Sequence, residues 1–151
     1  MKAHNPALVF FLPAWYKNLM KSINIIFFLL TIFLAVSCAT GSVVVADNLT
    51  AAEMVQRAHE ASDRNRYSVS LQYYEAILQR FPHDIEYVIT AEYEIAFIHY
   101  KQRNYEDSKR GFHRLLARYD APDSELLPAK FQVLANIVLE NIDEIESRRR
   151  R

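Results

Sequence analysis

Asn65-Arg-Tyr-Ser-Val-Ser70 has a counterpart 38 residues later in Asn104-Tyr-Glu-Asp-Ser108, where a tyrosine and a serine again stand three positions apart. The same offset relates blocks before and after these two stretches. It aligns Glu53–Ala58 with Ala91–Ala96 and with Ala129–Leu134, Tyr74 with Phe112, and Ile77-Leu78 with Leu115-Leu116. A period of this size predicts a helical solenoid, in which each repeat is one helical hairpin.

Each repeat is predicted to contain two helices. The first helix opens at Thr50, because this hydroxyl and the carboxylate of Glu53 have the spacing of a capping box. After a turn at Asn65-Arg66, the second helix runs until Pro82, which cannot continue the hydrogen-bond ladder. Apolar residues at helical spacing predict the buried stripes: Met54, Ala58 and Ala61 in the first helix, and Ser70, Tyr74, Ile77 and Leu78 in the second.

Three further helices are expected downstream. The third runs from Ile85 to about Arg103, and the fourth from Tyr105 to Tyr119. The fifth begins near Glu125, has Pro128 in its first turn, where proline is tolerated, and continues to about Ser147. The predicted fold class is therefore all-α: a short solenoid of about two and a half hairpins and five helices, preceded by a signal or anchor segment.

The residues around the turns resemble a tetratricopeptide repeat. That family places an aromatic residue after a short polar turn, a small residue three positions on, a second aromatic four positions later, and a proline near the end. These positions are held by Tyr67, Ser70, Tyr74 and Pro82 in the first unit and by Tyr105, Ser108 and Phe112 in the second. Serine replaces the usual alanine, the early tryptophan is missing, Asp120 replaces the closing proline, and the period exceeds the usual length of about 34.

Longer units that end in Phe-Pro, as at Phe81-Pro82, are similar to those of outer-membrane assembly lipoproteins of the BamD type and of cell-envelope scaffold proteins. The resemblance covers Thr50 to about Glu146, whereas BamD-type proteins are longer. It implies a protein that binds another protein.

The segment before the repeats resembles the export signal of a bacterial lipoprotein. Lys21 precedes an apolar run of 14 residues, Ile23–Val36, which suits a signal peptide and is short for a membrane-spanning helix. The single cysteine, Cys38, follows Ala35-Val36-Ser37 as in a relaxed lipobox, so the resemblance implies a lipid on the Cys38 thiol. An uncleaved anchor helix from Ile23 to Ala46 is the alternative.

The predicted organisation has four parts. Residues 1–37 are a signal peptide, with Met20 as an alternative start, and residues 38–49 are a flexible tether. Residues 50–147 form the helical domain, and residues 148–151 are a basic tail. A lipid on Cys38 would hold the protein on the periplasmic side of a bacterial membrane, and Ala39 after the cysteine favours the outer membrane.

Composition narrows the function. All 18 acidic residues and 15 of the 18 basic residues follow Cys38, so the mature chain carries a net charge of −3, and we expect no nucleic-acid groove. Two glycines argue against a glycine-rich phosphate loop, and one cysteine excludes a disulfide framework. We expect no enzymatic activity, cofactor or metal, because the histidines are scattered over different helices and turns at His59, His83, His99 and His113.

In a stack of hairpins, the first helix of each unit lines a concave wall that can hold a peptide. Aromatic side chains give this wall contact area, and Glu94 and Lys101 can orient a peptide by charge. Packing of Tyr93, Phe97 and Phe131 between helices is the alternative. The predicted partner-binding residues are Val55, Gln56, His59 and Asp63, then Tyr93, Glu94, Phe97, Tyr100 and Lys101, and then Phe131, Gln132, Ala135 and Val138.

The fifth helix has no predicted helix after it, and its apolar residues cover more than one face. We expect it either to lie across the end of the stack or to bind a partner or a second copy of the chain. Its apolar residues are Leu126, Leu127, Phe131, Leu134, Ile137, Val138, Ile142 and Ile145.

The functional hypothesis is a membrane-anchored adaptor of the cell envelope that binds a protein or peptide on its concave wall. One alternative is a component of an outer-membrane protein assembly complex of the BamD type. The other is a subunit of a periplasmic small-ligand transport assembly, which would require a deep cavity lined by Phe97, Tyr100 and Phe131.

Overall fold

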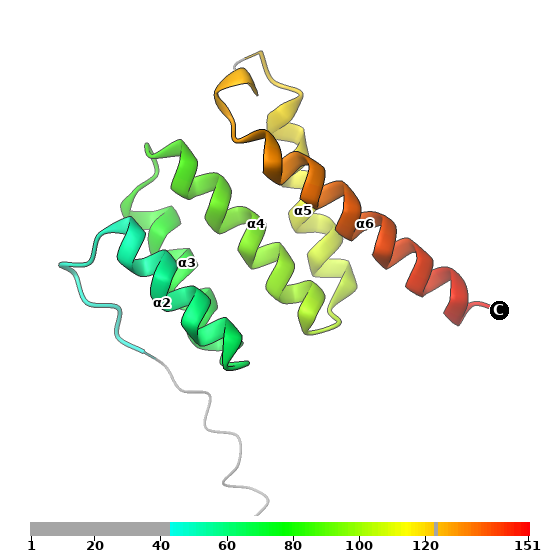
Figure 1. The fold of residues 1–151 in the computed structure, drawn as a ribbon, viewed down its shortest axis with the longest axis horizontal. Coiled ribbons are helices and arrows are strands. Elements are labelled where there is room, and N and C mark those ends of the chain that lie inside the picture. The colour runs from blue at the N-terminus through cyan, green and yellow to red at the C-terminus, as the bar shows by residue number, and fades with distance from the viewer. Residues whose placement is uncertain (1–42, 123) are drawn as a thin grey trace, which may run out of the picture. The chain divides into compact units, whose positions relative to one another are not determined.

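The computed structural model describes residues 43–122 and 124–151. These ranges hold five α-helices, one 3₁₀ turn and no strand. The elements are α2 (Ala51–Asp63), α3 (Tyr67–Arg80), α4 (Ile85–Lys101), α5 (Tyr105–Tyr119), η1 (Ser124–Leu126) and α6 (Ala129–Arg149). The helices α2 and α3 form one hairpin, α4 and α5 form the next, and α6 packs on the second (Figure 1). The predicted all-α stack of hairpins is confirmed.

The 38-residue period is visible in the backbone of the two hairpin turns. Asn65 and Arg103 both adopt the left-handed conformation, with φ of 57° and 62°. Each ends its helix in a Schellman motif: the Arg66 amide donates to the Ala61 carbonyl at 2.8 Å, and the Asn104 amide donates to the His99 carbonyl at 2.9 Å. The repeat in sequence is therefore a repeat in turn geometry.

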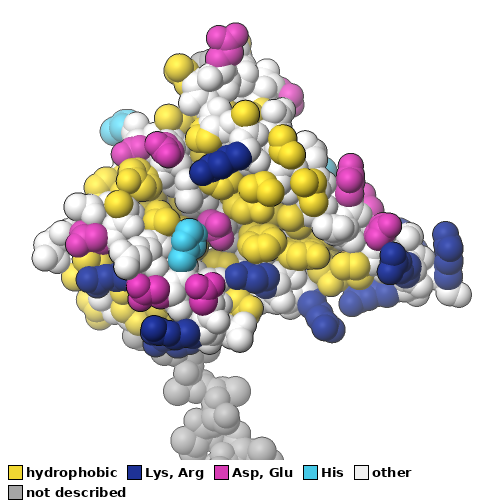
Figure 2. Space-filling model, viewed as in Figure 1, with side chains coloured by type: hydrophobic (Ala, Val, Ile, Leu, Met, Phe, Trp, Pro, Cys, Tyr) yellow, Lys and Arg dark blue, Asp and Glu magenta, His cyan; other side chains and the backbone are white. Residues whose placement is uncertain are grey.

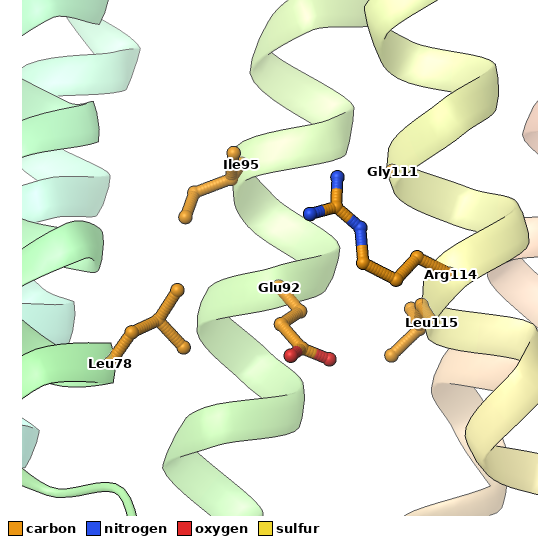
Figure 3. Close-up of a pocket in the computed structure, with 6 residues that line it drawn as sticks. All are labelled: Leu78, Glu92, Ile95, Gly111, Arg114 and Leu115. Atoms are coloured by element: carbon orange, nitrogen blue, oxygen red, sulfur yellow. The ribbon is translucent and has the colours of Figure 1, made fainter.

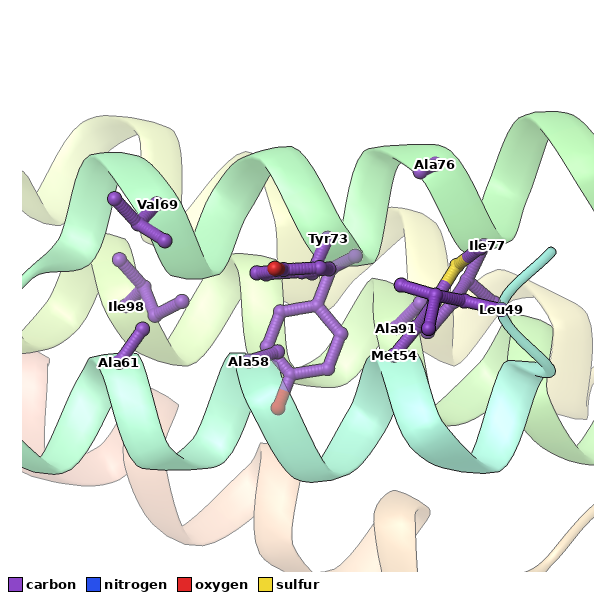
Figure 4. Packing of buried hydrophobic residues seen from close by; sticks show 11 residues of the cluster. Leu49, Met54, Ala58, Ala61, Val69, Tyr73, Ala76, Ile77, Ala91 and Ile98 are labelled. Carbon is purple, nitrogen blue, oxygen red and sulfur yellow. The ribbon is translucent and has the colours of Figure 1, made fainter. Parts of the chain in front are cut away.

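Two hydrophobic clusters hold the stack together, and α4 belongs to both. The first lies between α2 and α3 and includes Ala91 and Ile98 of α4 (Figure 4). The second lies between α4, α5 and α6, with Ile89, Tyr93 and Ala96 as the contribution of α4. Because both faces of α4 are buried, the hairpins form one continuous stack.

The predicted start of α2 agrees with the structure, and residues 43–46 before it, within the predicted tether, make hydrogen bonds to α3. Thr50 accepts from the Glu53 amide, and Glu53 accepts from the Thr50 amide at 2.9 Å, which completes the capping box. Upstream, the Val43 amide donates to Gln72 Oε1 at 2.8 Å, and Arg80 donates to the carbonyl of residue 46 at 2.8 Å. These contacts fix the segment against α3. The predicted signal peptide and Cys38 lie outside the described residues.

The last helix begins later than predicted. It starts at Ala129 instead of near Glu125, and Pro128 is its N-cap, with ψ of 104°. The reason is the proline, which disfavours helical backbone at the preceding Leu127, so residues 124–126 form a separate 3₁₀ turn. The Tyr119 hydroxyl donates to the Pro128 carbonyl at 2.9 Å and fixes this entry. The helix also continues to Arg149, so half of the predicted basic tail is helical.

None of the helices in the described ranges has the length and apolar character needed to cross a membrane.

Candidate functional site: a concave aromatic groove

The first helices of the hairpins, α2 and α4, lie side by side, with α6 on the other side of α4 (Figure 1). Their shared face carries a band of hydrophobic side chains, with a histidine and carboxylates on one side and basic residues around it (Figure 2). A pocket of about 350 Å³, open on one side, lies in this face. Its lining residues are Val55, His59, Glu86, Tyr87, Thr90, Tyr93, Glu94, Lys130, Phe131 and Leu134. Five of the residues that were predicted to bind a partner line this pocket: Val55, His59, Tyr93, Glu94 and Phe131.

Five aromatic rings form a continuous series along this wall, which we call the aromatic ladder. Its members in spatial order are Phe131, Tyr93, Phe97, Tyr100 and Tyr105. The successive ring centroids are 5.1, 5.8, 5.8 and 6.1 Å apart, and the two pairs within α4 are stacked. These separations are those of favourable aromatic pairs. Because the residues on α4 follow helical spacing, the helix itself sets the order of the rings.

The ladder has a buried end and a partly exposed remainder. Tyr93 and Phe131 are 6% and 5% exposed, and Tyr93 also contacts Phe112 at a centroid distance of 5.5 Å. Burial, with a smaller effect of the Glu94 charge, raises the pKa of Tyr93 to about 12. These two rings are therefore core residues that support the wall. Phe97, Tyr100 and Tyr105 are half-buried, so part of each ring faces solvent.

Three cations lie over the ladder. Lys130 Nζ is 4.7 Å from the centroid of Phe131, and Lys101 Nζ is 5.4 Å from that of Phe97. The guanidinium of Arg149 is 5.4 Å from the ring of Tyr105. Within the described residues, 43–122 and 124–151, no carboxylate forms an ion pair with any of these three cations. Their positive charge is therefore available to a bound partner.

Lys101 is held in place by contacts outside the ladder. Its ammonium group donates to the hydroxyl of Ser62 on α2 and lies 5.3 Å from the ring centroid of Tyr67 on α3. These contacts connect the end of α4 to the first hairpin. Lys101 is therefore a half-buried charge with a fixed position, and such a charge loses less entropy on binding than a free lysine.

One of the two carboxylates of the pocket, Glu94, lies beside a histidine, whereas Glu86 forms no ion pair in the described residues. His59 Nε2 on α2 is 3.5 Å from Glu94 Oε1 on α4, so a protonated His59 would neutralise this carboxylate. The same imidazole contacts Tyr74 edge to face at 6.1 Å. Glu94 thus connects two hairpins, in addition to lining the pocket.

The remaining predicted residues divide into three groups. Val55 lines the pocket from α2. Gln56 and Gln132 are exposed outside its lining, and Gln56 donates to Glu60 at 3.2 Å. Asp63 is exposed at the end of α2, whereas Ala135 and Val138 are buried in the second cluster. The pocket lining therefore includes only part of the predicted set.

The pocket and the aromatic ladder with its three cations together form what we call the groove. Several of its residues were not predicted to bind a partner. Tyr105 was interpreted as a turn aromatic, but the turn at Arg103 returns the chain so that its ring meets Tyr100. Arg149 was assigned to a solvated tail, but the helix continues through it. Lys130 could have been found from its position beside Phe131. The others are Glu86, Tyr87, Thr90 and Leu134.

The opposite side of α4 has a smaller notch, lined by Leu78, Glu92, Ile95, Gly111, Arg114 and Leu115 (Figure 3). Arg118 donates to Glu92 Oε1 at 2.6 Å and closes an ion pair between α5 and α4. The described residues hold no group of three metal-ligating side chains. Arg114 of the notch lies outside the lining of the pocket on the other face, so a substitution there is a control for substitutions in that pocket.

Comparisons with known proteins identify a relative without a described function. A protein of Treponema pallidum (strain Nichols), named "Uncharacterized protein", is 32% identical over 116 residues. The matched region spans 76% of this chain and 46% of the relative, so the chain spans about half the length of that protein. No family model matches the chain, and no solved structure matches it.

Proposed function

We propose that this protein is a membrane-anchored adaptor of the cell envelope, whose concave groove binds a segment of a protein partner. The observation that supports the groove is the partly exposed end of the aromatic ladder. Phe97, Tyr100 and Tyr105 form a continuous row of rings that the described chain covers only in part. Aromatic surfaces of this kind offer a large contact area at low conformational cost.

The charges of the groove favour a particular partner. Lys101, Lys130 and Arg149 lie over the rings without carboxylate partners in the described part of the chain, whereas Glu94 faces His59. The excess charge along the ladder is positive. The partner segment that fits best has apolar side chains to cover the rings and carboxylates to meet the cations.

The anchor is supported by sequence. The apolar run and the small residues before Cys38 resemble a lipoprotein signal, and the tetratricopeptide-like pattern agrees with a binding role. Mass spectrometry of the mature N-terminus tests the anchor independently of the groove. A diacylglyceryl group on Cys38 is expected, and an unmodified chain that retains residues 1–37 would contradict the anchor.

Co-purification from solubilised membranes tests the groove. Tagged full-length protein should retain a partner that the Lys101→Glu and Phe97→Ala variants lose. Arg114→Glu reverses an exposed charge in the notch on the other side of α4 and is the matched control, because it should retain the partner. Equal recovery with all three variants would contradict binding in the groove. Recovery of a β-barrel insertion complex would identify the function as the BamD-type alternative.

A small-ligand carrier is supported less well. That function requires a closed cavity lined by Phe97, Tyr100 and Phe131. In the structure Phe97 and Tyr100 remain partly exposed, and the pocket beside Phe131 is open on one side. An open wall suits an extended or helical segment better than a small molecule.

A further inference from the structure

The outer face of α6 is unusually apolar for this chain. Six large hydrophobic side chains are exposed in the described residues, and four of them belong to η1 and α6. Val133 and Ile137 are 59% and 48% exposed and lie one helical turn apart. The other two at this end are Leu126 and Leu134. Exposed apolar residues grouped in this way indicate an interface.

The packing register explains why this face is free. The inner residues of α6 recur at the spacing i, i+4, i+7 and i+11, at Phe131, Ala135, Val138 and Ile142. Ala91, Ile95 and Ile98 give α4 the same spacing where it packs on the first hairpin. In that packing register, which is offset by 40 positions instead of the 38 of the sequence repeat, Val133 corresponds to Tyr93, and Ile137 corresponds to Phe97. On α4 this second face packs against the following helices, which bury Tyr93 and partly bury Phe97, whereas on α6 the described chain supplies no cover.

Two opposite charges flank the exposed pair. Lys130 precedes Val133 by one turn, and Glu140 follows Ile137 by one turn, on the same side of the helix. Neither forms an ion pair in the described ranges. The neighbouring acidic residues do: Asp143 and Glu146 bind Lys109 at 2.7 and 3.1 Å, and Glu144 binds Arg148 at 3.1 Å.

We propose that a second copy of this chain covers this face, with the two α6 helices antiparallel about a two-fold axis level with Ala135. This arrangement places Val133 of each copy against Ile137 of the other. It also places Lys130 of each copy opposite Glu140 of the other, so the apolar centre is flanked by two symmetric ion pairs. In such a dimer Lys101 and Arg149 remain the cations available to a partner in the groove. A self-complementary patch of this kind is what an isologous dimer requires. Lys130 and Glu140 are each five positions from the axis at Ala135, and helices that pack at a shallow crossing angle stay close enough over this length for the two side chains to meet.

Cross-linking between two copies tests the register. Full-length chains with tags of different size are co-expressed, one with Val133→Cys and the other with Ile137→Cys, and membranes are oxidised. The control pairs Ile137→Cys with Ala52→Cys, an exposed position on α2. Cys38 is present in every chain, so its contribution is common to both. We expect the mixed-size dimer to be at least about fivefold stronger for the 133–137 pair than for the control.

Charge reversal completes the test. Lys130→Glu in both copies should reduce the cross-linked band several-fold, because two carboxylates then face each other. Adding Glu140→Lys should restore it. A 133–137 band no stronger than the control would overturn the dimer, and a failure of the double reversal to restore the band would overturn the proposed register. Circular dichroism of each variant verifies folding. These readouts require no partner in the groove, so this proposal can fail while the proposed function stands.

Discussion

Gly111 of α5 lies against Ala96 of α4 so closely that a Cβ at position 111 would be 2.7 Å from the Cβ of Ala96. Ala96 is fully buried, so it cannot move aside. The second hairpin therefore depends on the absence of a side chain at residue 111.

Gly111→Ala should destabilise the protein. Overpacking costs about 1–3 kcal/mol, and the better helix propensity of alanine returns about 1 kcal/mol, so we expect a net loss of up to about 2 kcal/mol. Chemical denaturation measures it. Adding Ala96→Gly removes the clashing methyl group, so the coupling between the two substitutions should be favourable. Simple additivity would contradict the contact.

The two buried serines of the repeat should respond differently to alanine. Ser70 Oγ donates to the Ala58 carbonyl at 2.8 Å, so Ser70→Ala should cost about 1 kcal/mol. Ser108, 38 residues later, is equally buried, but its hydroxyl has no partner in the described chain. Ser108→Ala should therefore be neutral or stabilising, because it removes an unsatisfied polar group. If both substitutions lowered the free energy of unfolding equally, the Ser108 hydroxyl would have a hydrogen-bond partner like that of Ser70, and the prediction would be wrong.

The two left-handed turn residues give a reciprocal pair of predictions. Asn65 suits its positive φ, whereas Arg103 adopts nearly the same angle with a residue type that disfavours it. Arg103→Asn should stabilise the protein by up to about 1 kcal/mol, and Asn65→Arg should destabilise it by a similar amount. Thermal unfolding of both variants checks the signs. If both substitutions changed the melting temperature in the same direction, the left-handed conformation of the two turn residues would not be the cause.

Stability should fall between neutral and mildly acidic pH, because His99 is partly buried and its Nδ1 has no partner in the described residues. Burial lowers the pKa of His99 below its ordinary value of 6.5, and the Arg110 charge adds to this, whereas Glu75 opposes it. The unfolded chain then binds the proton more readily, so the free energy of unfolding decreases as the pH falls through 6.5 toward the folded-state pKa.

His99→Gln should reduce this pH dependence between about pH 7 and pH 5.5, and chemical denaturation at both values measures it. The window lies above the range in which the Glu53 and Asp143 carboxylates titrate, since their pKa values are lowered by the Thr50 cap and by Lys109. The control is His83→Gln, at an exposed position in the turn between α3 and α4. An unchanged pH slope in His99→Gln would exclude His99 as the cause.

The sequence contained most of the fold because local signals agreed with the period. Thr50 and Glu53 placed the start of α2, and Pro82 the end of the first hairpin. The start of α6 was predicted too early. We placed Pro128 inside the first turn, where proline is tolerated, and did not consider that it disfavours helical backbone at the residue before it. The order of residues 43–49 depends on contacts with Gln72 and Arg80, which no local pattern reveals.

The candidate site could be predicted only along a single helix. Helical spacing placed Tyr93, Phe97 and Tyr100 on one side of α4, and the structure keeps them together. The contribution of Tyr105 and Arg149 depends on how separate helices meet, which the sequence does not specify. Burial of Tyr93 likewise depends on Phe112 and Phe131, which come from other helices.

Photo-cross-linking from the groove tests the adaptor account most directly. A benzophenone amino acid replaces Tyr100 in the ladder or, as the control, exposed Arg114 in the notch, in the full-length protein within cells that produce it. The account predicts a discrete protein adduct on irradiation from position 100 and none from position 114. Absence of any adduct at position 100, or the same adducts from both positions, would contradict binding of a partner by the aromatic groove.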